Sequence, residues 1–169
     1  IGALIRAIRR ELDSIGLRYE LLVIDGGSTD QTTAEVEEAE TKWIHQRSPG
    51  FGSAVREGMI QAKGDWILLM DADWSHPPSI IRDLWSARVS TATAAAGGSA
   101  GGNQSLVDLV IGSRNVGGAS SDAPFYRRLL TGLLHLVYAA AFRSGVRDVS
   151  SGFRLYRRSA LTPLQYQAR

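Results

Sequence analysis

Two carboxylates, Asp71 and Asp73, stand two residues apart, directly after the apolar run at residues 65–70. This run predicts a buried strand, so both carboxylates are expected where that strand ends. Mg²⁺ and Mn²⁺ prefer hard oxygen ligands and often complete their shell with substrate phosphates. A cation held by the pair would neutralise the charge that develops on a diphosphate leaving group. An acidic turn or a helix cap fits the same two residues, so the pair alone leaves the choice open.

A second polar segment, residues 25–30, follows another apolar run at residues 20–24. It combines the carboxylate of Asp25 with a glycine turn whose backbone is accessible. A nucleotide base or ribose offers N–H and O–H donors, which a carboxylate accepts. A glycine turn followed by a helix N-cap explains these residues almost as well.

Three arginines from separated segments, Arg114, Arg127 and Arg154, would form a phosphate clamp if the fold brought them together. Their region is basic: residues 113–169 have nine Arg against two acidic residues, whereas residues 1–112 have ten Lys and Arg against fifteen Asp and Glu. Such an asymmetry predicts anionic partners, namely phosphates, nucleic acid or a membrane surface. A solvated basic face is the alternative.

Several function classes lack support in the sequence. There is no Cys among the 169 residues, and His45, His76 and His135 lack the spacing of metal ligands. No Gly-x-Ser-x-Gly or Walker-A motif occurs, which disfavours a nucleophilic hydrolase and a P-loop NTPase. The aromatic-plus-basic repeats of RNA-binding modules are missing as well, so no nucleic-acid partner is expected.

Hydrophobic periodicity predicts alternating strands and helices in one domain that spans residues 1–169. Helices are expected at 1–15, 31–40, 53–63, from Pro77 to 89, and at 124–142, and strands at 20–24, 43–45, 65–70, 106–111 and 152–156. This order indicates an α/β fold with a mainly parallel sheet. Residues 90–105 are rich in Gly, Ala, Ser and Thr and are expected to form a flexible insertion. Ligands of such sheets bind beyond the carboxyl ends of the strands, where Asp25, Asp71 and Arg114 are expected.

The motifs, taken in order, resemble those of glycosyltransferase family 2, and most closely its polyprenol-phosphate (dolichol-phosphate) mannose synthases. Met70-Asp-Ala-Asp-Trp-Ser-His-Pro-Pro78 is very similar to their Met-Asp-Ala-Asp-Leu-Ser-His-Pro-Pro. The other matching segments are Val23-Ile-Asp-Gly-Gly-Ser-Thr-Asp-Gln-Thr32, Gly50-Phe-Gly-Ser-Ala54, Ala62-Lys-Gly-Asp65, Val110-Ile-Gly-Ser-Arg114 and Asp148-Val-Ser-Ser-Gly-Phe-Arg154. Their order and spacing agree over nearly the whole chain, except for the insertion.

The resemblance implies a GT-A fold, which is a Rossmann-like three-layer α/β/α sandwich. It also implies a role for each matching residue. Asp25, Asp71, Asp73 and Arg154 would bind the nucleotide sugar, and Asp71 and Asp73 would hold Mg²⁺ or Mn²⁺. The lipid phosphate of the acceptor would be bound by Arg114, Arg127 and Thr131. Asp73, Arg114 and Arg127 would be the catalytic residues.

The chain departs from the family pattern at three places. Gly26 stands where the family usually has a second Asp, and Pro124 and Phe125 replace a Gly-Trp segment. The family's first strand, with its Pro-x-Tyr-Asn-Glu motif, is missing. We therefore expect the chain to be a fragment that lacks this strand and further C-terminal sequence.

The acceptor follows from a chemical argument. A sugar hydroxyl must be deprotonated by a further carboxylate base, but the acidic motif that supplies this base in processive members of the family is not found. A phosphate monoester is already ionised and needs only positioning and charge balance, which Arg residues provide.

We therefore expect transfer of mannose from GDP-mannose to a polyprenyl phosphate, dolichyl or undecaprenyl, with inversion. The reaction would take place at the cytoplasmic face of a membrane. A UDP-sugar donor of the glucose type and a non-catalytic nucleotide-sugar-binding module are the alternatives.

Overall fold

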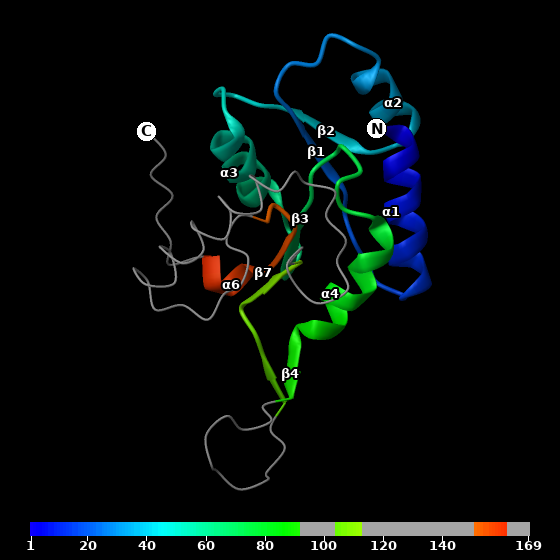
Figure 1. Cartoon of the computed structure of the whole chain (residues 1–169). Coiled ribbons are helices and arrows are strands. Elements are labelled where there is room, and N and C mark those ends of the chain that lie inside the picture. The colour runs from blue at the N-terminus through cyan, green and yellow to red at the C-terminus, as the bar shows by residue number, and fades with distance from the viewer. Residues whose placement is uncertain (92–103, 113–150, 162–169) are drawn as a thin grey trace, which may run out of the picture.

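The computed structural model describes residues 1–91, 104–112 and 151–161 (Figure 1). The helices are α1 (Gly2–Ser14), α2 (Thr32–Glu38), α3 (Phe51–Gln61), the 3₁₀-helix η1 (Pro78–Ile80), α4 (Ile81–Ala87) and α6 (Arg158–Leu161). The strands are β1 (Leu22–Asp25), β2 (Lys42–His45), β3 (Trp66–Leu69), β4 (Val89–Thr91), β5 (Gln104–Leu106), β6 (Leu109–Ile111) and β7 (Arg154–Arg157). The alternation confirms the predicted α/β class.

The strands pair in three groups. Strands β1 and β2 are parallel, as predicted, with Leu22 opposite Lys42. Strand β7 lies between β3 and β6 and is antiparallel to both, so β3 and β6 run in the same direction. Strands β4 and β5 form an antiparallel hairpin. The prediction of a mainly parallel sheet therefore needs one correction. In the described part of the chain, β7 runs antiparallel to both of its neighbours.

Helix α1 connects the two hydrophobic clusters of the described core. Its residue Leu12 packs in one cluster with Ile81, Leu84 and Phe153. Its residue Ile5 packs in the other, against α2. The spacing of these apolar residues predicted the helix, because positions three and four apart share one helix face. Gly2, in the first turn of α1, donates its backbone N–H to Glu35 of α2 at 2.7 Å, which supplies an acceptor that the helix start lacks.

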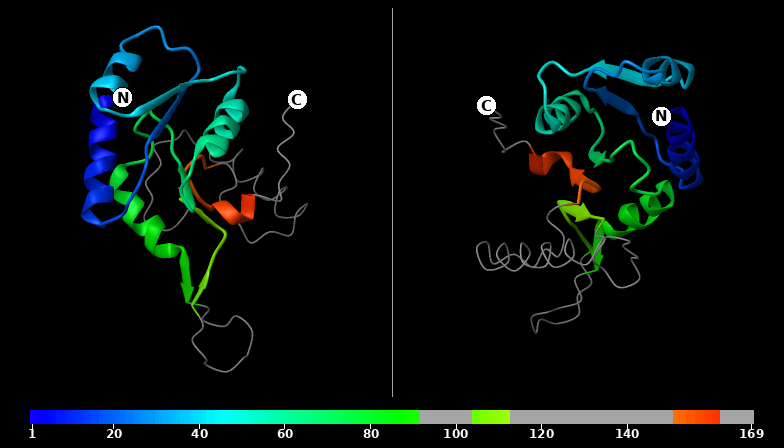
Figure 2. Two further views of the ribbon diagram at one scale, coloured as in Figure 1. Left: turned by 180° about the vertical axis from the view of Figure 1, so that it is seen from behind. Right: turned by 45° about the horizontal axis from the view of Figure 1, so that its top comes forward.

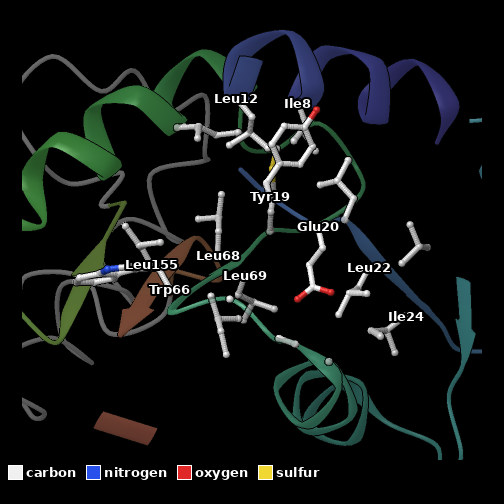
Figure 3. A pocket seen from close by; sticks show the side chains of 18 of the residues that line it. Ile8, Leu12, Tyr19, Glu20, Leu22, Ile24, Trp66, Leu68, Leu69 and Leu155 are labelled. Carbon is white, nitrogen blue, oxygen red and sulfur yellow. The ribbon is translucent and has the colours of Figure 1, made fainter. Parts of the chain in front are cut away.

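An apolar slot of about 550 Å³ separates β1 from β3. Helices α1 and α3 lie on opposite sides of these strands in Figures 1 and 2 and line the slot as well. Figure 3 shows side chains of β1, β3 and α1 that point into it, together with the carboxylate of Glu20. Neither β1 nor β3 pairs with a described strand on this side.

Two strands overlap the ends of the insertion predicted at residues 90–105. Residues 90 and 91 belong to β4 and residues 104 and 105 to β5, so the pairing extends into both ends of the segment at 90–105. Residues 92–103, like the predicted helix at 124–142, lie outside the described residues. The hairpin projects away from α1 and α3 in Figure 1 and in both views of Figure 2.

The single strand predicted at 106–111 is wrong, because β5 ends at Leu106 and β6 begins at Leu109. Val107 donates its N–H to Arg88 at the start of the hairpin, whereas Asp108 accepts from the N–H of Arg157 in β7. The chain changes its pairing partner between these two residues, and the strand breaks there. Among the helices that the structure describes, none is both long and apolar enough to cross a membrane.

Candidate functional site

Asp25 ends β1 and is buried, with 7% of its surface exposed. Its Oδ2 accepts the backbone N–H groups of Gly27 at 3.2 Å and Ser28 at 3.0 Å. Its Oδ1 accepts the Ser28 hydroxyl at 2.5 Å and, more weakly, the Ser28 N–H at 3.2 Å. The hydroxyl of Ser28 is the main cause that lowers the pKa of Asp25, so the carboxylate is ionised at neutral pH.

These bonds use nearly all the acceptor sites of the Asp25 carboxylate, which has about four. The predicted contact between this carboxylate and a nucleotide stays a prediction. The geometry favours an indirect role, in which Asp25 holds the turn at residues 26–30 in shape. The backbone of that turn is exposed and includes Gly27 at φ 109°, a value suited to glycine.

Asp73 lies on the loop that follows β3, and its side chain is exposed. Its Oδ1 accepts the backbone N–H of Ser75 at 2.9 Å. Hydrogen bonding to Ser75 lowers the pKa of Asp73, so this carboxylate is also ionised at neutral pH. The next residue, Trp74, is half exposed and has φ 63°, a conformation that is uncommon for a bulky side chain. The loop is therefore a tight turn that presents an ionised carboxylate to solvent.

Asp71 lies at the base of the same loop, and its side chain is 40% exposed. Its Oδ2 lies 3.7 Å from Nε2 of His76, which is buried. The imidazole of His76 stacks on the ring of Phe153, with ring centroids 4.9 Å apart and planes 9° apart. The loop with the two carboxylates is thus joined to the segment just before β7.

Arg154, the first residue of β7, lies opposite Leu69 in the β3–β7 register. This pairing brings the backbone of Arg154 to the end of β3. Leu69, its partner there, precedes Asp71 by two residues. Its Nε donates to the carbonyl of Ser151 at 2.7 Å, and its Nη1 lies 3.3 Å from the hydroxyl of Tyr156. The predicted role of Arg154 in binding the nucleotide sugar stays a prediction, as does its convergence with Arg114 and Arg127.

The other predicted site residues, Arg114, Arg127 and Thr131, lie outside the described residues. Sequence reasoning missed the contact of His76 with Asp71, and it missed the stacking on Phe153. Both residues stood in recognised motifs, but these motifs are far apart in the sequence. No local pattern shows that they meet.

The described residues include no group of three or more His, Cys, Asp and Glu side chains that could hold a metal ion. The loop after β3 offers two carboxylates, those of Asp71 and Asp73. This donor set fits Mg²⁺ or Mn²⁺, which are commonly bound by one or two carboxylates together with substrate phosphates. It does not fit a closed structural site of the zinc type, which needs four protein ligands.

An α/β domain with ionised or solvent-accessible carboxylates where β1 and β3 end has the general form of a nucleotide-binding enzyme domain. The model of the family "Glycosyl transferase family 2" matches residues 1–164. The chain therefore belongs to glycosyl transferase family 2, as its motifs predicted.

One relative is a dolichol-phosphate mannosyltransferase from Pyrococcus furiosus. It is 33% identical over 154 residues, and the match covers 86% of this chain and 40% of that protein. The chain thus spans well under half the length of this relative.

The fold also resembles that of solved structures. One is glucosyl-3-phosphoglycerate synthase from Mycobacterium tuberculosis in complex with Mn²⁺, UDP-glucose and phosphoglyceric acid. Its TM-score is 0.64 at 21% identity, and the match covers 96% of this chain and 55% of that one. A second structure of this synthase matches with a TM-score of 0.63 at 22% identity, over 96% of this chain and 56% of that chain. At such identities the likeness shows the fold, and it agrees with the expected GT-A architecture.

Proposed function

We propose that the chain is the donor-binding part of a glycosyltransferase that moves a sugar from a nucleotide sugar to a polyprenyl phosphate. The observation that supports this most directly is the loop after β3, which holds Asp71 and the ionised Asp73 and follows Leu69, the residue paired with Arg154. Such a loop suits a diphosphate, because the carboxylates hold a cation and the guanidinium offers a further positive charge. The Pyrococcus relative is named for the transfer of mannose to dolichol phosphate, which supports this acceptor class.

Each residue of the site has a distinct task in the proposed reaction. Asp25 keeps the turn at residues 26–30 in the shape that faces the nucleoside, while Asp71 and Asp73 hold Mg²⁺ or Mn²⁺. The cation, when bound, neutralises charge on the diphosphate leaving group. Arg154 binds a phosphate oxygen of the donor.

The acceptor phosphate attacks the anomeric carbon, and the bond from that carbon to the nucleoside diphosphate breaks with inversion. No protein base is needed, because the phosphate monoester is already ionised. Arg114, Arg127 and Thr131 are proposed to hold it in line with the leaving group. The acceptor is a lipid, so we propose that the protein works at the cytoplasmic face of a membrane.

GDP-mannose is the proposed donor, supported by the resemblance of the segment at residues 70–78 and by the name of the relative. A direct test gives the full chain radiolabelled GDP-mannose or UDP-glucose, with polyprenyl phosphate and Mn²⁺, and measures label in the lipid phase. We expect label from GDP-mannose and its loss when EDTA is added. If only UDP-glucose labels the lipid phase, the proposed donor is wrong, but the proposed transfer of a sugar to a polyprenyl phosphate stands.

A chain that binds a nucleotide sugar but transfers from neither donor would be a non-catalytic module. A physical reason for that outcome is Gly26, which stands where the family usually has a second Asp and lacks a carboxylate. An Arg114→Ala variant provides a further check on an active chain, because it should weaken the use of the lipid phosphate and leave donor affinity unchanged.

A further inference from the structure

The carboxylate of Asp71 lies against a glycine that is distant in the sequence. A Cβ atom built on Gly152 would lie 2.8 Å from Oδ2 of Asp71 and 3.4 Å from its Cγ. Real Cβ atoms essentially never come within 3.0 Å of another heavy atom. The carboxylate therefore occupies the space that any side chain at position 152 would need.

The residues around Asp71 are themselves held firmly. His76 is 4% exposed and Phe153 is 1% exposed, and their rings stack. The hydroxyl of the fully buried Ser151 donates to the carbonyl of Gly112 at 2.7 Å and accepts the N–H of Phe153 at 3.2 Å. Residues 151–153 therefore form a rigid platform next to the end of β6.

We propose that Gly152 and His76 are positioning residues that hold the carboxylate of Asp71 in its cation-binding orientation. This inference rests on the proposed function, because it assigns these two residues to the proposed cation site. A half-exposed aspartate otherwise samples several rotamers, and a ligand that is already oriented binds a cation more tightly. The imidazole contact and the missing Cβ together restrict the carboxylate to the orientation seen in the structure.

Glycine is needed at position 152 because a side chain there has no space, and not because the backbone conformation requires it. Its φ lies outside the left-handed region, in contrast to Gly16, Gly27 and Gly50. An alanine at this position therefore strains no backbone, and the atom that it meets is the end of a side chain that can rotate away. Gly152→Ala should leave the fold intact while it displaces the carboxylate of Asp71.

The test measures Mn²⁺ affinity by titration calorimetry on the full chain, with saturating GDP and, separately, UDP. Gly152→Ala is expected to weaken Mn²⁺ binding about 10- to 100-fold, the range found when groups that orient a metal ligand are changed. The matched control is Gly52→Ala in α3, where a Cβ meets no atom within 4 Å and Mn²⁺ affinity should stay unchanged. A crystal structure of the Gly152→Ala protein should show the carboxylate of Asp71 rotated away.

A second variant guards against a protein that fails to fold. His76→Phe keeps a ring to stack on Phe153 but removes the Nε2 atom beside Asp71, so it should weaken Mn²⁺ binding in the same direction. Wild-type Mn²⁺ affinity in both variants would overturn the positioning role while the cation site itself stands.

A wild-type chain that binds no Mn²⁺ with either nucleotide would instead refute the cation site of the proposed function. The crystal structure of the Gly152→Ala protein then decides the positioning role separately. An unmoved Asp71 carboxylate in that structure would refute the role, and a displaced carboxylate would support it.

Discussion

The buried carboxylate of Asp25 should stabilise the fold in a way that depends on pH, and Asp25→Asn tests this. In wild type, the two carboxylate oxygens of Asp25 accept hydrogen bonds from Gly27 and Ser28. The asparagine side chain keeps only one acceptor oxygen. Its NH₂ group takes the place of the other oxygen and cannot accept. At least one hydrogen bond to a charged group is lost, and such bonds contribute roughly 1.5–3 kcal/mol. We expect the free energy of unfolding to fall by about 2 kcal/mol at pH 7.

The pH dependence has a defined sign. Hydrogen bonds from Ser28 lower the pKa of Asp25 below its ordinary value of 3.8. A lowered pKa in the folded state means that the stabilisation is complete above the unfolded-state value and is lost as the pH falls through the folded-state value. The stability difference between wild type and Asp25→Asn should thus be constant from neutral pH to about pH 5, and it should shrink progressively as the pH falls further, through 3.8.

Urea unfolding at a series of pH values measures this difference. Asp65→Asn is the matched control, because Asp65 is exposed and its substitution should change stability by less than about 0.5 kcal/mol. Equal stability of Asp25→Asn and wild type at pH 7 would show that the turn does not depend on the carboxylate. A difference that disappears between pH 5 and 7 would contradict the lowered pKa.

Other parts of the molecule give four further predictions. Gly112→Ala should lower stability by about 1–3 kcal/mol in thermal melts, because its Cβ would lie 2.5 Å from the buried ring of Phe153; an unchanged melting temperature would show that the ring can move. Replacing residues 92–103 with a short turn between β4 and β5 should change the urea midpoint little, since loop closure depends weakly on length, and lost donor binding would reveal a function there. Asp73→Ala should reduce turnover at least about a hundredfold, or about 2.7 kcal/mol, and full activity in EDTA would contradict a cation role. Arg127→Ala should raise the apparent KM for polyprenyl phosphate about ten- to a hundredfold, whereas a loss of donor affinity with normal acceptor KM would refute this assignment.

The sequence predicted the local elements well, because their signals are local. Helix α1 follows from apolar residues at helical spacing, and β1 and β3 follow from short apolar runs that are followed by an aspartate. The placement of Asp25 and Asp71 at strand ends was predicted for the same reason. Family membership followed from motifs whose order and spacing are specific.

The pairing of strands was not predictable, because an apolar run does not indicate its partner. Strand β7 pairs with β3 although about 85 residues separate Leu69 from Arg154, and its antiparallel direction has no local signal. The break between β5 and β6 arises because Val107 and Asp108 bond to different neighbours. The contact of Gly152 with Asp71 depends on all of these pairings, so no motif predicted it.

The position of β7 has a consequence for synthesis on the ribosome. Strand β7 is the middle strand between β3 and β6, yet it is the last of the three to be translated. At about 5–20 residues per second, Arg154 follows Leu69 after roughly 4 to 17 s. During that interval the loop with Asp71 and Asp73 has neither its strand partner nor the platform at residues 151–153. Strand β3 therefore stays without its partner until nearly all the described residues have emerged. Formation of the β3–β7–β6 sheet is thus a late and slow step in folding.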